Sequence, residues 1–184
     1  MTRKIVVGIT GASGAPYAKR LAHVLRETPN VEVAACLSKT APEVWKLECG
    51  GDIREELGIP IFSDFNAPFA SGSAGWNAMA IVPCSMGTLA RVAHGLSENL
   101  LTRAADVMLK ERRTLVVVPR ETPLSLIHLE NMTTLARAGA VIVPAMPSFY
   151  KNPKTIGDII DTVVARVLDH LGVKQTLVRP WGET

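Results

Sequence analysis

Two hydrophobic patterns alternate along the chain. Short runs of apolar, largely β-branched residues are separated by segments in which apolar residues recur at helical spacing. The first pattern is typical of buried strands and the second of helices packed on a sheet. The pattern predicts strands at Lys4–Ile9, Val31–Leu37, Ile59–Phe62 (an edge strand), Ala78–Val82, Thr114–Val118 and Val141–Val143. It predicts helices at Pro16–Arg26, Ala41–Glu48, Thr88–His94, Asn99–Lys110, Ser125–Ala138 and Ile156–Leu171.

This alternation predicts an α/β protein with a mostly parallel sheet between two layers of helices. We therefore expect a flavodoxin-like or Rossmann-like three-layer sandwich, in which ligands bind beyond the carboxyl ends of the strands. The chain has no internal repeat or linker, so residues 1–184 are expected to form a single domain. The stretch Gly50–Gly75 is rich in Gly, Pro, Ser and Asp, and is expected to be an irregular, functional loop.

Composition narrows the class of protein. The net charge of +3 is small, and the basic residues are not clustered, so neither nucleic-acid nor membrane binding is indicated. No apolar run reaches the length of a membrane span, and no signal peptide is recognisable at the start. Three cysteines without metal-ligand spacing indicate free thiols in a reducing compartment. We expect a cytoplasmic protein without a metal site.

The candidate site residues follow predicted strands. Gly11-Ala12-Ser13-Gly14 comes after the first strand and opens a helix, where small residues let backbone N–H groups approach an anion. The stretch lacks the Gly-Lys-Ser/Thr of a P-loop and the spacing of a dinucleotide fingerprint, so a simple tight turn remains an alternative. Ser13 could cap the helix or bind a phosphate.

The stretch Pro83–Thr88 follows another buried strand. Ser85 and Thr88 can form a helix N-cap, or they can line a turn that holds a flavin phosphate or ribityl chain. Cys84 has no histidine placed by motif to activate it, so a buried structural thiol is the better interpretation.

Charged and aromatic residues follow the last two strands. Arg120 and Glu121 stand between two prolines directly after the strongest strand, where charges are costly unless they have partners. The planar guanidinium of arginine suits a phosphate. Tyr150, after the last strand, can contact a phosphate or complete the core, whereas Lys110 and Arg166 lie on predicted helices, where a solvated position is the usual explanation.

Taken together, the motifs resemble those of the UbiX-like flavin prenyltransferases over almost the whole chain. The matching stretches are GITGASGAPYAKRL, LSKTA, ASGS, IVPCSMGTLARVAHGLSENLLTRAADVMLKERR, LVVVPRETPLSLIHLENM and PSFY. The resemblance implies an enzyme that joins a dimethylallyl group from dimethylallyl phosphate to N5 and C6 of reduced FMN, without a metal. The product is prenylated FMN for UbiD-like decarboxylases. The resemblance also implies a homododecamer with flavin sites at subunit contacts, so some residues are expected to act on a neighbour's ligand.

The resemblance assigns roles by position. It implies FMN contacts from Gly11, Ala12, Ser13, Ser38, Ser85, Met86, Gly87, Thr88 and Arg120. It implies that Tyr150 and Arg166 bind the dimethylallyl phosphate, that Lys110, Arg120 and Glu121 complete the phosphate pocket, and that Ser71 and Arg103 line the site. Glu48, near Ser13, corresponds to a carboxylate implicated in proton transfer. The catalytic set is therefore Glu48, Ser13, Lys110 and Glu121.

Two departures and two alternatives accompany this interpretation. Phe65 and Pro180 stand where the family is expected to have Trp and Arg, and both positions belong to the lid or rim of the site. A flavin-dependent cysteine decarboxylase shares the Pro-x-Ser-x-x-Thr turn, but it uses a histidine after the second strand, and residues 31–52 contain none. A flavin carrier or non-catalytic decarboxylase subunit would have no use for the cations Lys110, Arg120 and Arg166.

Overall fold

The computed structural model describes residues 2–179 and 182. Its centre is a six-stranded sheet in the order β3-β2-β1-β4-β5-β6, and every neighbouring pair is parallel. The strands are β1 (Arg3–Ile9), β2 (Val31–Leu37), β3 (Ile61–Phe62), β4 (Ala78–Cys84), β5 (Thr114–Pro119) and β6 (Val141–Ile142). The doubly wound α/β fold is confirmed, with the strand order of a Rossmann fold.

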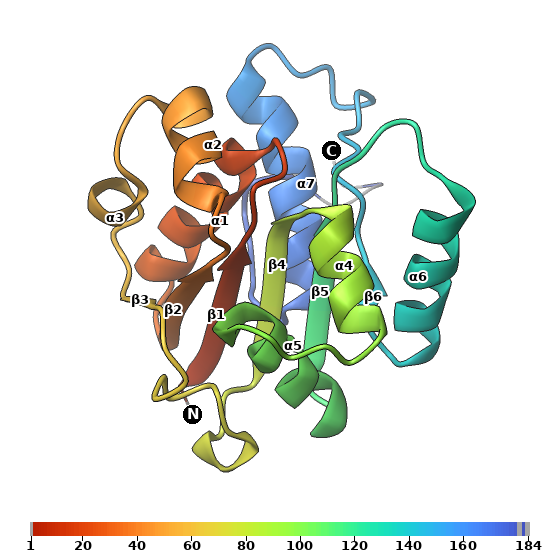
Figure 1. Ribbon diagram of the computed structural model, residues 1–184. Helices are drawn as coiled ribbons and strands as arrows, with labels where there is room; N and C mark the ends of the chain where they lie inside the picture. Colours follow the sequence, from red (N-terminus) through yellow and green to blue (C-terminus); the bar gives the residue numbers. More distant parts are fainter. Residues whose placement is uncertain (1, 180–181, 183–184) are drawn as a thin grey trace.

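Helices cover both faces of the sheet (Figure 1). The core on one face joins side chains of the sheet to α1 (Ala15–Glu27), α2 (Ala41–Cys49), α3 (Ile53–Glu56) and α7 (Ile156–His170). The core on the other face joins the sheet to α4 (Met86–Ala93), α5 (Leu100–Lys110) and α6 (Leu126–Arg137). Alternate residues of β1 divide between the two cores: Ile5, Val7 and Ile9 face the first, and Val6 faces the second. This two-sided burial explains why the strands are continuous apolar runs.

The region between α2 and β4 differs from the expectation of an irregular loop. It contains α3, the edge strand β3 and a 3₁₀ turn at Gly72–Ala74. Asp52 caps α3 by accepting a hydrogen bond from the N–H of Arg54 at 2.7 Å, and the buried Ile53 anchors it. The prediction missed α3 because the region is rich in polar residues and the helix is only one turn long.

Hydrogen bonds continue the sheet past the ends of its strands. The N–H of Ser38 donates to the carbonyl of Ile9 at 2.9 Å, and the N–H of Thr10 donates to that of Pro83 at 3.3 Å. The N–H of Arg120 donates to the carbonyl of Cys84 at 3.2 Å. The carboxyl ends of β2, β1, β4 and β5 are thereby joined, and the candidate motifs lie at this edge.

Candidate functional site at the carboxyl ends of the strands

The turn after β1 is held by a carboxylate from another helix. Oε2 of Glu48 accepts hydrogen bonds from the N–H groups of Gly14 and Ala15, both at 2.8 Å. These N–H groups begin α1, where the helix dipole favours a negative charge. The end of α1 that could have bound a phosphate is therefore occupied by a side chain of the protein itself.

Glu48 is ionised more easily than an ordinary glutamate. Burial acts to raise the pKa of Glu48, but the Ser13 hydroxyl, the two N–H groups of α1 and the positive charge of Arg120 together lower it. The structure thus places Glu48 beside Ser13, where the family resemblance put it, and near enough to Arg120 to be affected by its charge. The result is a carboxylate in contact with hydrogen-bond donors at the candidate site.

Gly11 lies against the start of α2. A Cβ at this position would lie 2.0 Å from Oγ1 of Thr40 and 2.7 Å from its Cβ, so only glycine fits. Ser38 lies nearby, and its hydroxyl is 3.4 Å from that of Thr40. The sequence interpretation included Gly11 and Ser38 but missed Thr40, whose contact with Gly11 is visible only in three dimensions.

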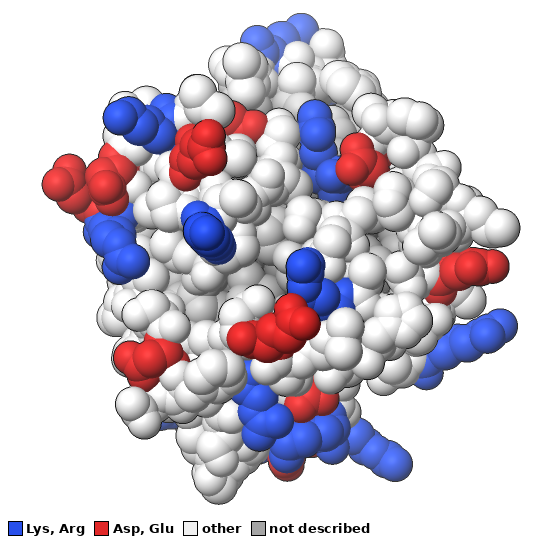
Figure 2. Space-filling model, in the orientation of Figure 1, with Lys and Arg blue, Asp and Glu red and all other residues white. Residues whose placement is uncertain are grey.

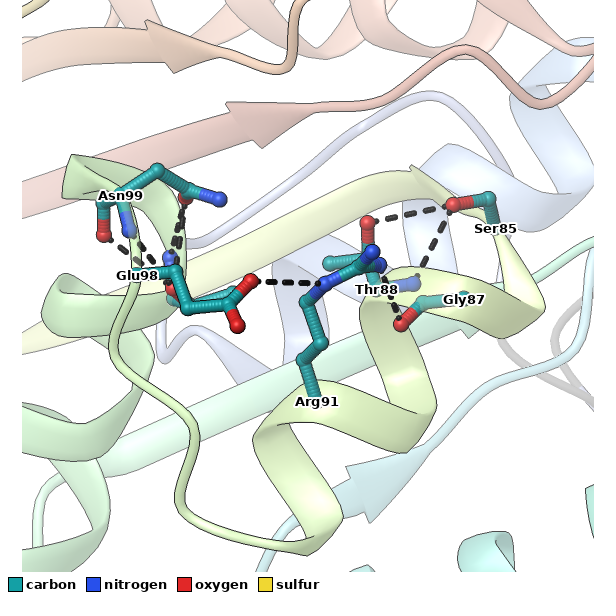
Figure 3. A network of polar contacts seen from close by, with 7 residues as sticks. Ser85, Gly87, Thr88, Arg91, Glu98 and Asn99 are labelled. Atoms are coloured by element: carbon teal, nitrogen blue, oxygen red, sulfur yellow. Dashed lines mark hydrogen bonds and ion pairs between the residues drawn. The ribbon is translucent and has the colours of Figure 1, made fainter.

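The turn after β4 has the expected N-cap. The Ser85 hydroxyl accepts a hydrogen bond from the Thr88 N–H at 3.4 Å and donates to the Thr88 hydroxyl at 3.1 Å. Arg91 donates to the Gly87 carbonyl at 2.9 Å and to the Glu98 carboxylate at 3.2 Å, which ties this turn to the loop before α5 (Figure 3). Met86 and Thr88 are buried, whereas Gly87 is exposed. Helix capping and ligand binding are compatible here, because an exposed backbone remains.

The cysteines are all free, in agreement with the sequence interpretation. Burial raises the pKa of the Cys84 thiol far above its ordinary value, so this residue is a structural thiol.

A second group of predicted residues lies in a separate pocket. Tyr150 and Arg166 both line a cavity of about 390 Å³ formed by the segment after β6, by α7 and by residues 175–179. Arg166 donates to the Asp169 carboxylate at 2.9 Å, and Arg179 also lines the cavity. None of the described residues that line this cavity belongs to the turns after β1, β4 or β5. The sequence interpretation linked the C-terminal segment that begins at Arg179 to closure of the site, but it gave Arg179 itself no role.

A third group is spread along α5 and the turn before β4, and its member Lys110 lies at the opposite end of the sheet. Lys110 is the last residue of α5, four residues before β5 begins, and it forms an ion pair with Glu111. Arg103, in the first turn of α5, donates to the Ala70 carbonyl at 3.1 Å. Ser71 is exposed in the turn just before β4. Basic side chains gather at this lower end of the molecule (Figure 2). Within one chain, Lys110 is therefore not brought into a pocket with Arg120 and Glu121, which lie exposed after β5.

The two positions at which the chain departs from the family pattern are Phe65 and Pro180. Phe65 is 56% exposed in the region between α3 and β4. Pro180 lies outside the described residues. Among the residues that the structure describes, no cluster of His, Cys, Asp and Glu could hold a metal ion. No helix in the described part of the chain is long and apolar enough to cross a membrane.

A doubly wound sheet with glycine and hydroxyl-rich turns at its carboxyl edge is typical of proteins that bind a phosphorylated cofactor. In agreement with this, the family model described as "Flavoprotein" matches residues 1–168. A probable UbiX-like flavin prenyltransferase of Streptomyces sp. (strain D7) is 49% identical over 182 residues, covering 97% of this chain and 91% of the relative. The chain belongs to the family of UbiX-like flavin prenyltransferases.

Two solved structures agree with this assignment. A dodecameric FMN-dependent UbiX-like decarboxylase from Escherichia coli O157:H7 is 47% identical, with a TM-score of 0.94 over 98% of this chain and 100% of that one. AnUbiX (PadA1), in complex with FMN and dimethylallyl pyrophosphate, is 42% identical, with a TM-score of 0.95 over the full length of both chains. Peptidyl-cysteine decarboxylase EpiD shares the fold alone, at 16% identity and a TM-score of 0.65 over 93% of this chain and 99% of that one.

Proposed function

We propose that this chain joins a dimethylallyl group to N5 and C6 of reduced FMN, using dimethylallyl phosphate and no metal. The observation that carries the proposal is the Glu48 carboxylate held by the N–H groups of Gly14 and Ala15 at a turn of small residues, where the Ser13 hydroxyl and the charge of Arg120 also act on it. Membership of the prenyltransferase family supports the same reaction.

The residues at the strand ends fit FMN. Flavin carries a ribityl chain and a phosphate, which need hydroxyl and N–H donors and a positive charge. Ser13, Ser38, Ser85 and Arg120 offer these groups around the turns after β1, β2, β4 and β5. Gly11, Ala12, Met86, Gly87 and Thr88 would complete the site. Reduced FMN supplies an electron-rich nitrogen when bound, and the protein supplies position and charge.

The cationic residues suit departure of a phosphate. The leaving group carries a charge of roughly −1.5 to −2 near pH 7, which positive side chains stabilise in a site that excludes water. We assign this role to Lys110, Arg120 and Arg166, with Tyr150 and Glu121 orienting the phosphate and with Ser71 and Arg103 lining the site. The pyrophosphate in the AnUbiX structure makes the diphosphate an alternative donor to test.

Proton transfer falls to Glu48 in this proposal. Glu48 is a carboxylate at neutral pH and can accept a proton once substrates have displaced water, whereas the donors that lower its pKa weaken it as a base until substrate binding changes those contacts. Ser13 orients the carboxylate through its hydrogen bond.

The separation of the three residue groups implies that the site is assembled between subunits. Lys110 lies at the amino ends of the strands and Arg120 at the carboxyl ends, so one chain does not place both beside one phosphate. An assembly such as the dodecamer of the E. coli relative would bring them together from neighbouring subunits.

Free cysteines support a cytoplasmic location, and residues 1–184 are proposed to act as one domain. The product would pass to a UbiD-like decarboxylase.

The test is an anaerobic incubation of purified protein with reduced FMN and dimethylallyl phosphate in metal-free buffer, followed by mass spectrometry of the flavin. A flavin heavier by one five-carbon prenyl unit is expected. Unchanged flavin with the phosphate and also with the diphosphate, from protein that binds FMN, would contradict the proposal and favour a carrier. Release of carbon dioxide from a peptidyl cysteine would favour the cysteine decarboxylase.

A further inference from the structure

Thr10 is a buried polar residue for which the sequence interpretation provided no role. It follows β1 directly, precedes the Gly11–Gly14 turn, and is only 2% exposed. A buried hydroxyl is costly unless its hydrogen bonds are made. The hydrogen-bond partners of the Thr10 hydroxyl therefore indicate its structural role.

Partners of the Thr10 hydroxyl lie at the end of β4 and in the turns that follow β1 and β4. It donates to the Pro83 carbonyl at 2.8 Å and accepts from the Ser85 N–H at 2.9 Å. It also accepts a longer hydrogen bond from the Ala12 N–H at 3.4 Å. A hydroxyl has one donor and two acceptor positions, so these three hydrogen bonds use its full capacity.

The two turns joined by Thr10 come from different strands. Ala12 belongs to the turn after β1, and Ser85 begins the turn after β4. The backbone contact between Thr10 and Pro83 is a 3.3 Å hydrogen bond at the last point where the strands meet. Beyond that point the Thr10 hydroxyl forms hydrogen bonds to both turns, to the N–H of Ala12 and to the N–H of Ser85.

We propose that Thr10 is a positioning residue that fixes the distance between the two flavin-binding turns. The inference rests on the proposed function, because it takes both turns to contact FMN. Thr10 itself need not touch the flavin, since its hydroxyl is already occupied by the protein. FMN affinity depends on this residue through the placement of the Ala12 and Ser85 backbones.

The substitution that isolates the hydroxyl is Thr10→Val, which keeps a β-branched shape. It leaves the partly buried Ser85 N–H without its partner, and we expect FMN to bind at least about tenfold more weakly. Thr10→Ser keeps the hydroxyl and should bind FMN within about threefold of wild type, because its hydrogen bonds can be remade. Thr28→Val is the matched control, since its hydroxyl donates to the Val24 carbonyl at 2.7 Å, at the far end of α1.

The experiment is a titration of each apoprotein with FMN, followed by flavin fluorescence, with KM for each substrate measured separately. Thr10→Val should raise Kd and KM for FMN while KM for dimethylallyl phosphate stays unchanged. A merely structural defect would lower the fraction of active protein and leave Kd unchanged, which would overturn the inference. If Thr10→Val does not fold, the serine variant decides: Kd raised tenfold in Thr10→Ser would also overturn it.

The outcome separates the inference from the proposed function. Wild-type protein that fails to bind FMN would contradict the function. Wild-type protein that binds FMN, together with a Thr10→Val variant of equal affinity, would contradict only the role of Thr10.

Discussion

At the scale of single residues, the Glu48 carboxylate at the start of α1 combines a structural contact with a chemical role. The contact depends on ionisation, because a neutral carboxyl group cannot accept from both N–H groups and the Ser13 hydroxyl as strongly. Since its pKa is lower in the folded protein than in the unfolded chain, ionised Glu48 stabilises the fold.

This linkage predicts a pH-dependent difference between wild type and Glu48→Gln. Above the ordinary glutamate pKa, wild type should have the higher Tm. The difference should shrink as pH falls through the lowered pKa of Glu48 and vanish once the carboxylate is protonated. Thermal unfolding of both proteins between neutral and acidic pH measures it, and a difference that persists unchanged in acid would contradict the linkage.

Glu48→Gln should also reduce turnover much more than FMN affinity, because the amide keeps an acceptor oxygen but is not a base. Steady-state rates and FMN titrations on the same preparation distinguish the two effects. Turnover equal to that of wild type would exclude the proton-transfer role.

At the scale of elements, the caps determine where the helices of the site begin. Asn99 and Thr102 form a reciprocal capping box at the start of α5: the Asn99 side chain accepts from the Thr102 N–H at 3.0 Å, and the Thr102 hydroxyl accepts from the Asn99 N–H at 3.3 Å. Arg91 and Glu98 connect the residues just before this box to α4 (Figure 3). The first turn of α5 carries Arg103, so the cap positions a predicted site residue.

Asn99→Ala should lower the free energy of unfolding by about 1 kcal/mol, the usual cost of a lost N-cap. Asn99→Asp retains an acceptor at the cap and is the matched control, expected to stay close to wild type. Urea unfolding of the three proteins measures this, and equal loss in both variants would show that the cap hydrogen bond is not responsible.

Most elements could be predicted from the sequence. Strands buried on both faces are continuous apolar runs, and helices packed on the sheet by one face have apolar residues at helical spacing. Val31–Leu37 was predicted with its observed bounds, and the prediction that β3 lies at the edge is confirmed. The helix α4 begins at Met86 rather than Thr88, because Ser85 and not a later residue supplies the cap. The predictions missed α3, since one turn leaves too little periodicity to detect.

The site was less predictable than the fold. Ser13, Ser85 and Arg120 were identified because each follows a predicted strand. They lie at the same edge of the sheet because parallel strands all end there. Thr10 and Thr40 were missed because their contacts join residues from different strands, which no local pattern encodes. The distance between Lys110 and Arg120 depends on the direction of α5 along the sheet, which the motifs do not contain.

At the scale of the whole molecule, the three groups of predicted residues lie in different places on one chain. If neighbouring subunits bring Lys110 and Arg120 together, a defect in one residue can be compensated by another subunit. Lys110→Ala and Arg120→Ala proteins should each be nearly inactive, because each removes a charge from every site.

Mixing these two variants after dissociation and reassembly should restore about a quarter of wild-type activity, the share of sites that receive both intact residues from random neighbours. Reassembly of each variant alone is the control. Activity that stays absent in mixed assemblies, with their formation verified by mass spectrometry, would place both residues in the same chain's site.

The same separation has a genetic consequence. A subunit that is defective both at Lys110 and at Arg120 damages the site built on its own strand ends and also the one it completes on a neighbour. In a cell that makes normal and doubly defective chains together, the loss of prenylated flavin would then exceed the proportion of defective chains. The placement of two side chains at opposite ends of a sheet would thus make such an allele partly dominant.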